Sequence, residues 1–184
     1  LDGDGQYQTV KANIRANDVV MPGAAQLAIG SAIIDADVTL YDTPHIVADV
    51  QIADTRYQAY HVAVGRAKID YRDGSGRVQA LLEGTSGVPF RVALNGDLAP
   101  EQWRVALNGR ASGVNFRTQN PARIAITSAG YELLPTTGDL GRGSRARLSG
   151  RYGDDGLILQ SRLDRVNMAL LNNAFPDMGL GGHA

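Results

Sequence analysis

A hexapeptide that occurs twice places the tightest constraint on how this chain folds. The sequence Arg-Val-Ala-Leu-Asn-Gly fills residues 91–96 and again residues 104–109, an offset of 13 residues. A second pair, Ser-Gly-Val at residues 86–88 and 112–114, is separated by 26 residues, twice the first offset. Short segments repeated at a regular spacing are typical of a sheet built from similar strands joined by turns.

Apolar and polar residues alternate within each copy. Phe90, Val92 and Leu94 fall on one face of an extended strand, because successive side chains of a strand point to opposite faces. The second copy gives the equivalent row Trp103, Val105 and Leu107. The same alternation runs through Ala32, Ile34, Ala36, Val38 and Leu40, and through Ile46, Ala48, Val50 and Ile52. The pattern predicts strand after strand, each with one apolar face.

Composition favours an all-β fold. Glu occurs at three positions and Lys at two, and these are the residues that usually cover helix surfaces. The 22 Gly and seven Pro supply turns, among them the tight-turn sequence Asp-Gly-Ser-Gly at residues 73–76. Turns this short favour antiparallel pairing, because parallel strands need long crossover connections. Only residues 167–175 have a helical pattern, with Asn167 as N-cap and Pro176 after its end.

The chain is expected to be one β-repeat segment over residues 1–184, with no internal boundary, cut from a longer protein. It begins at Leu1 without an initiator Met and ends within a pattern. Two irregularities are expected in the strands. The apolar positions change parity at Gly65, which predicts either a bulge or the start of a new strand there. Pro135 is expected to end the strand that begins near Tyr131.

Candidate catalytic and metal-binding residues are few. Asp35 and Asp37 share one face of a strand about 7 Å apart, a separation at which paired carboxylates can perform acid–base chemistry. Alternation already requires polar residues on that solvent face, so we interpret them as surface residues. His45 and His61 lack a second ligand at metal spacing. The sequence has no nucleophile elbow and no phosphate-binding lysine loop, so we expect no enzyme activity, no metal and no cofactor.

Charge gives little indication of a partner. The net charge is −1, which argues against nucleic acid as a ligand. Six arginines form the only basic concentration: Arg142, Arg145, Arg147, Arg151, Arg162 and Arg165. Phosphate or lipid head-group contact is one interpretation, and a mixed, solvated edge is the other, since four aspartates lie among them. No apolar run reaches the roughly 18 residues of a membrane span.

Several segments, taken in order, resemble the middle of the TamB family. They are residues 29–40, 121–126, 145–151, 157–171 and 175–182. TamB proteins are inner-membrane subunits of the translocation and assembly module of Gram-negative bacteria. They are related to AsmA-like, bridge-forming lipid-transfer proteins. The resemblance covers most of the chain, although no single segment in it is specific.

The resemblance implies a periplasmic location, as part of a protein anchored in the inner membrane. It also implies a long, curved, taco-like sheet whose concave face is apolar and shields phospholipid acyl chains between the inner and outer membranes. TamA, an outer-membrane partner of the Omp85 type, would bind through parts that this chain does not contain. Transport of this kind requires no catalysis, in keeping with the expected lack of an active site.

Ten residues are predicted to line such a groove: Phe90, Val92, Leu94, Trp103, Val105, Leu107, Val114, Phe116, Ile124 and Ile126. Two alternatives stay open. The same apolar face can close on itself as a dry core, as it does in most soluble β domains. The chain can also be a structural module that assists outer-membrane protein assembly by pairing its edge strands with those of other proteins.

Overall fold

The computed structural model describes residues 8–21, 27–40, 44–154 and 156–165. The chain divides into two compact units, Leu1–Pro100 (unit 1) and Glu101–Ala184 (unit 2). The described residues form strands and turns with no helix, and every strand pairing within either unit is antiparallel. The all-β, antiparallel prediction is therefore confirmed.

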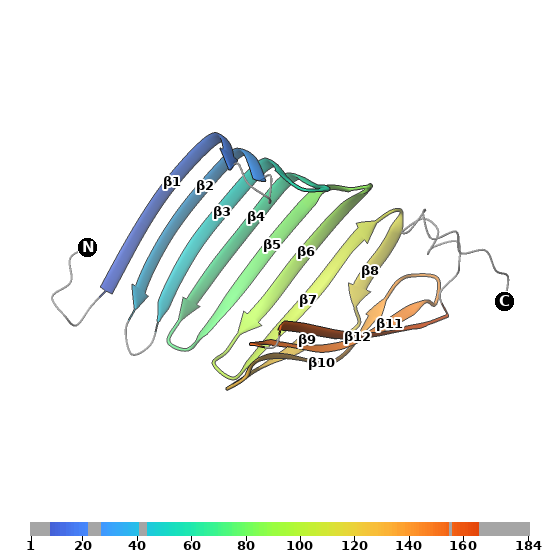
Figure 1. Cartoon of the computed structure of the whole chain (residues 1–184). Coiled ribbons are helices and arrows are strands. Elements are labelled where there is room, and N and C mark those ends of the chain that lie inside the picture. The colour runs from blue at the N-terminus through green and yellow to red at the C-terminus, as the bar shows by residue number, and fades with distance from the viewer. Residues whose placement is uncertain (1–7, 22–26, 41–43, 155, 166–184) are drawn as a thin grey trace. The chain divides into compact units, whose positions relative to one another are not determined.

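Unit 1 is a six-stranded meander, in which each strand pairs with the next one along the chain (Figure 1). Its strands are β1 (Gln8–Met21), β2 (Leu27–Leu40), β3 (His45–Tyr57), β4 (Tyr60–Arg72), β5 (Ser75–Ser86) and β6 (Val88–Leu98). Over most of their length the strands pair in a regular register, so side chains at paired positions line up in rows that cross all six strands.

The turn between β4 and β5 has the geometry that its sequence predicts. Asp73 and Gly74 both have positive φ, 50° and 79°, and Arg72 pairs with Ser75. Two central residues with positive φ define the type I′ turn, whose twist matches that of the flanking strands. An Asp-Gly pair tolerates this conformation at little cost.

The bulge expected at Gly65 lies instead between Val62 and Val64, where the register of β4 against β5 shifts. Gly65 pairs regularly with Ile52 and Leu82. It is glycine for a packing reason, because a Cβ there would lie 2.5 Å from the Cγ1 atom of Ile52. The alternation pattern therefore predicts a bulge correctly, but the bulge does not lie at the glycine.

Unit 2 is less regular. Its strands are β7 (Gln102–Ala111), β8 (Val114–Thr118), β9 (Ala122–Thr127), β10 (Gly130–Asp139), β11 (Arg145–Gly153) and β12 (Gly156–Asp164). The short strands β8 and β9 each pair with β7 and with β10, so together they fill one strand position. β11 then pairs with β10, and β12 pairs with β11.

Pro135 does not end a strand, because β10 continues through it to Asp139. The register of β10 against β11 shifts between Leu133 and Thr136. A proline cannot donate to the ladder, and a bulge is one of the few strand positions that tolerates this loss. The helix predicted at residues 167–175 lies outside the described residues, and the expectation of one uninterrupted repeat segment stays a prediction.

Candidate functional site

The main surface feature of unit 1 is a face made only of uncharged residues. Four adjacent rows cross all six strands, and we call these 24 positions the apolar face of unit 1. The rows are Val10, Val38, Ile46, Tyr71, Gly76 and Leu98; Ala12, Ala36, Ala48, Ile69, Val78 and Gly96; Ile14, Ile34, Val50, Ala67, Ala80 and Leu94; and Ala16, Ala32, Ile52, Gly65, Leu82 and Val92. The register thus combines separate alternating segments into one continuous apolar surface.

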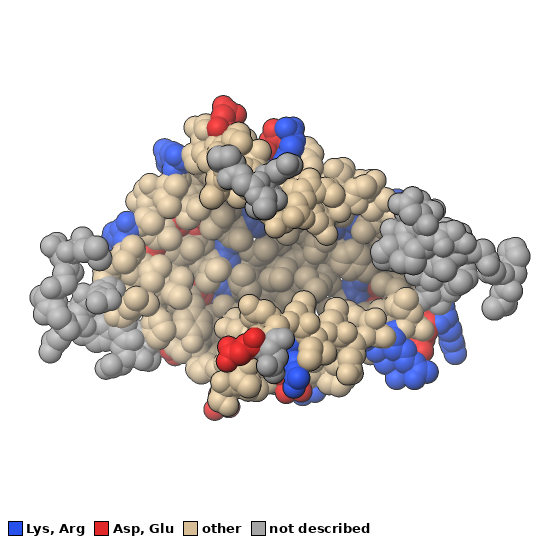
Figure 2. All heavy atoms as spheres, viewed as in Figure 1, with Lys and Arg blue, Asp and Glu red and all other residues tan. Residues whose placement is uncertain are grey.

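This face stays accessible. Ala32 is the one described residue of unit 1 among the buried hydrophobic residues. Three of its larger side chains are well exposed, Val10 at 43%, Ile14 at 49% and Leu82 at 40%, and inner ones such as Ile34 and Val50 are partly exposed. Figure 2, drawn from the same side as Figure 1, shows uncharged atoms over most of the visible surface.

The opposite face of unit 1, which we call its polar face, holds charged residues in complementary positions. Lys11 faces Asp37 across β1 and β2, with an Nζ–Oδ2 distance of 3.2 Å. Lys68 forms a 2.9 Å ion pair with Asp49, and the hydrogen bond from this ammonium group lowers the pKa of the Asp49 carboxyl group below its ordinary value. Alternation therefore separates these charged side chains from the apolar rows.

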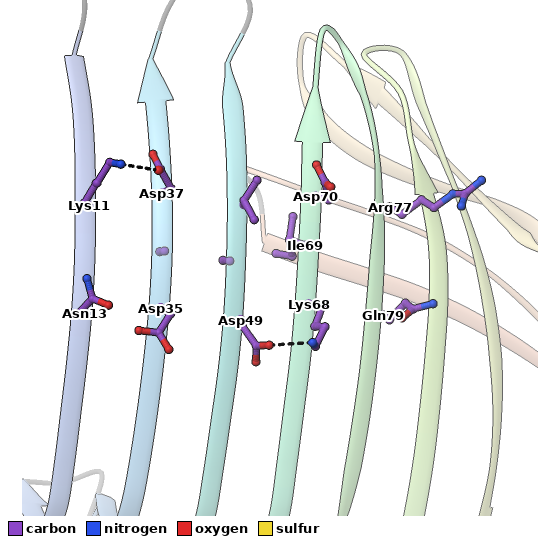
Figure 3. Close-up of a pocket in the computed structure, with 13 residues that line it drawn as sticks. Lys11, Asn13, Asp35, Asp37, Asp49, Lys68, Ile69, Asp70, Arg77 and Gln79 are labelled. Carbon is purple, nitrogen blue, oxygen red and sulfur yellow. Dashed lines mark ion pairs between the residues drawn. The ribbon is translucent and has the colours of Figure 1, made fainter.

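A shallow hollow of about 590 Å³ lies on the polar face, over strands β1 to β5. Figure 3 shows its labelled side chains, among them the two ion pairs of Lys11 and Lys68. Asp35 lies between them, directly opposite Asn13 on one side and Asp49 on the other. The hollow mixes acidic and basic groups, so it lacks the uniform charge that would select an ion.

The ten predicted groove residues fall in both units. Phe90, Val92 and Leu94 lie on one side of β6, and the last two belong to the apolar face of unit 1. The remaining seven share one face of unit 2: Trp103, Val105, Leu107, Val114, Phe116, Ile124 and Ile126. Within each unit the predicted residues share one face of the sheet, and their role as the lining of a groove stays a prediction.

Part of the unit 2 face is closed by packing. Val105 is only 8% exposed and pairs with Ala122, which is 7% exposed. The ring of Trp103 lies against that of Tyr131, with centroids 5.2 Å apart and planes tilted by 38°. These residues act as a local core, whereas β12, which pairs with β11, exposes Leu157 to 71% and Leu159 to 57%.

The prediction omitted most of the accessible apolar face, which lies on β1 to β5. Ile14, Ile34 and Val50 belong to its central row, yet they were not named as groove residues. The sequence does contain a pattern that indicates this part of the face, because β2 and β3 contain long alternating runs. The repeated hexapeptide drew the prediction towards β6 and β7 instead.

The structure does not bring the candidate aspartates and histidines together in one cluster. Asp35 and Asp37 lie on the polar face as expected, and Asp37 pairs with Lys11. His61 Nε2 lies 2.7 Å from Asp54 Oδ1, while His45 Nε2 is buried without a hydrogen-bond partner. Within the described ranges, no three His, Cys, Asp or Glu residues are grouped so that they could hold a metal ion.

The arginine concentration proves to be a mixed edge in the part that the structure describes. Arg147 and Arg162 face each other across β11 and β12, and both approach the carboxylate of Asp164, at 3.7 Å and 3.2 Å. Asp139 accepts a hydrogen bond from the backbone N–H of Gly141. This bond, assisted by Arg117, lowers the pKa of the Asp139 carboxyl group.

No helix among the described residues is long and apolar enough to span a membrane. Comparison with known proteins gave no match for this chain among protein families, curated proteins or solved structures.

Proposed function

We propose that the apolar face of unit 1 binds the acyl chains of phospholipids, and that the chain is a non-enzymatic segment of a TamB-like protein of the periplasm. In this proposal the sheet curves so that the apolar face is concave and forms a groove. Lipid would move along the groove between the inner and outer membranes. A TamA-type partner would bind through other parts of the protein.

The observation that carries the proposal is the size and continuity of the accessible apolar face. Five strand spacings and three two-residue steps give it a footprint of roughly 24 by 20 Å, or about 480 Å². The largest contiguous apolar patch of a soluble monomer typically covers about 300–600 Å² and is often a functional site, so this face has the size expected of an interaction surface. Many of the side chains here are small, and the face contains no charged group that would oppose an apolar ligand.

The energetics favour an acyl chain as that ligand. Transfer of each CH₂ group out of water contributes about 0.8 kcal/mol, so roughly 16 carbons contribute on the order of 13 kcal/mol. A face on which every row is uncharged would bind an acyl chain similarly at each position. The chain could then slide without meeting a deep energy minimum, and no reacting side chain is needed.

The test compares two arginine substitutions at adjacent positions of β5. Ala80 lies in the central row of the apolar face, between Ala67 and Leu94. Gln79 is its neighbour in the chain but points to the polar face, between Lys68 and Asn95. Ala80→Arg places a charge among acyl chains, whereas Gln79→Arg makes the same charge change outside them.

Native mass spectrometry and lipid extraction of the purified chain are the measurements. We expect phospholipid to co-purify with the unaltered chain and with Gln79→Arg, and to be lost from Ala80→Arg while circular dichroism still reports a folded sheet. A lipid-free unaltered chain, which also takes up no lipid from vesicles, would refute the proposal. Equal lipid content in the two folded variants would refute it as well.

A further inference from the structure

The edge of unit 1 formed by β1 has a charge pattern that indicates what kind of strand it can bind. Among the described strands, β1 pairs only with β2, so one side of its backbone has no strand partner there. Its side chains are also more exposed than those of the inner strands, with Val20 at 70% and Met21 at 56% in addition to Val10 and Ile14. An edge strand with free backbone groups can accept a further strand.

Within unit 1, charged residues that face each other across strands are almost always of opposite sign. Lys11 faces Asp37, and Asp49 faces Lys68. The same holds for Asp70 opposite Arg77, Arg77 opposite Asp97, and Glu83 opposite Arg91. Directly opposed unlike charges stabilise strand pairing, and like charges destabilise it. The one like-charged pair is Asp35 opposite Asp49.

The edge strand β1 presents the cationic half of such pairs. Lys11 and Arg15 lie on its polar face, with Asn13 between them. The exposed Arg15 faces Ile33 on β2 and forms no ion pair with a described residue. The other face of β1 is apolar, with the side chains of Val10, Ala12 and Ile14. A complementary strand would therefore carry carboxylates on one face and apolar side chains on the other.

We propose that the edge of β1 that has no partner among the described strands binds an extended segment in which apolar residues alternate with acidic ones. The segment would add a seventh strand beside β1. Its apolar side chains would extend the apolar face over Val10 and Ile14, and a carboxylate would lie opposite Arg15. The regular pairing of β1 with β2 is interrupted at Asp18, whose φ is 51°, so a segment of about nine residues would match the regular part of β1.

The pairing register also indicates why a second copy of β1 is a poorer partner. An antiparallel pair of β1 strands centred on Asn13 would place Lys11 of each copy opposite Arg15 of the other. Such like-charged contacts destabilise the pair. Shifted registers avoid them but leave Arg15 without a carboxylate. An acidic, apolar-alternating segment satisfies both faces at once.

The test uses fluorescent nine-residue peptides and the full chain, with anisotropy as the readout. One peptide alternates Val with Asp, a second alternates Val with Lys, and a third is the Val/Asp peptide with a central Pro. We expect the Val/Asp peptide to bind at least about fivefold more tightly than the Val/Lys peptide. The Pro peptide should not bind measurably, because proline removes a backbone donor and breaks the ladder.

Arg15→Glu should reverse the preference, so that the Val/Lys peptide becomes the better ligand by a similar factor. Arg66→Glu is the matched control, since Arg66 lies on the same polar face but on the inner strand β4, opposite Gln51 and Leu81. It should leave the preference unchanged at physiological salt, because it lies about 14 Å from β1, beyond the screening length. Hydrogen exchange should show new protection of the amides of β1.

Three results would overturn the inference. The first is equal binding of the acidic and basic peptides, and the second is an unchanged preference in Arg15→Glu. The third is that the chain sediments as a dimer and that the outward-facing amides of β1 are already protected from hydrogen exchange without peptide. None of these depends on lipid. Loss of peptide binding and loss of lipid binding are therefore separate outcomes.

Discussion

The two copies of the hexapeptide allow the two units to be compared at identical sequence. Residues 91–96 lie in β6 of unit 1, and residues 104–109 lie in β7 of unit 2. Val92 pairs with Leu82 and stays partly exposed, whereas Val105 pairs with Ala122 and is 8% exposed. The same valine is thus part of an accessible surface in one unit and part of a small core in the other.

The arginines that precede these valines differ in the same way. Arg91 faces Glu83 and forms an ion pair with it at 3.2 Å, while Arg104 faces Arg123. The hexapeptide determines which side chains share a face, because alternation is a local property of a strand. Its neighbours across the sheet determine burial and charge pairing. Three predictions test this distinction, from the largest effect to the smallest.

The largest effect is expected at a glycine whose surroundings leave no room for a side chain. In unit 1, a Cβ at Gly84 would overlap the carbonyl oxygen of His61. Gly84→Ala should therefore lower the free energy of unfolding by about 3 kcal/mol. In unit 2, the nearest atom to a Cβ at Gly138 is the Arg117 carbonyl oxygen at 3.6 Å, an ordinary contact. Gly138→Ala should change stability by less than about 1 kcal/mol.

Urea unfolding followed by circular dichroism measures both variants. Hydrogen exchange then shows which strands lose protection, and we expect the loss in Gly84→Ala to be confined to unit 1. A Gly84→Ala chain as stable as the unaltered one would show that β4 and β5 can separate to admit a methyl group.

The second effect compares the paired valines directly. Val105→Ala removes buried methyl groups and should cost about 2 kcal/mol. Val92→Ala removes the same groups from a partly exposed site and should cost about 1 kcal/mol or less. Thermal and urea unfolding of the two variants measure the difference. Equal costs would mean that the two hexapeptides have the same environment in solution.

The smallest effect concerns pH and separates two carboxylates by the cause of their lowered pKa. A carboxyl group whose pKa is lowered on folding stabilises the fold above its unfolded pKa, near 3.8. This stabilisation is lost as the pH falls through the lower, folded value. The pKa of Asp49 is lowered chiefly by Lys68, whereas that of Asp139 is lowered chiefly by the Gly141 N–H.

Salt should therefore act differently on the two groups. At about 1 M salt, where the screening length is about 3 Å, the contribution of exposed ion pairs falls. NMR titration of the carboxyl carbons should show the pKa of Asp49 rising towards its ordinary value, with a smaller change for Asp139. A larger rise for Asp139 would contradict the assignment of causes.

Much of the fold could be predicted from local pattern. Alternation gave the strands and their apolar sides, and Asp73-Gly74 gave a turn, because each depends on residues close in sequence. The division of one strand position between β8 and β9 could not be predicted in this way, since it depends on β7 and β10 together. The structural roles of Pro135 and Gly65 were also predicted wrongly, because they too depend on the strands that lie beside them.

The candidate site was predicted less well than the fold. Alternation identifies an apolar side chain, but it does not indicate whether another layer covers it. Val105 and Ile14 look equivalent in the sequence, yet the first is 8% exposed and the second 49%. Only the arrangement of neighbouring strands separates a core residue from one that is accessible to a ligand.

The meander of unit 1 also bears on the order in which the chain acquires its structure during synthesis. Each strand from β2 to β6 finds its partner in the strand made just before it, so no early strand waits for a distant one. Folds dominated by such local contacts form quickly for sheets, because little loop entropy is lost at each closure. Unit 1 can therefore assemble one strand at a time behind the ribosome, and an incomplete unit would expose the edge of its newest strand in addition to the edge of β1.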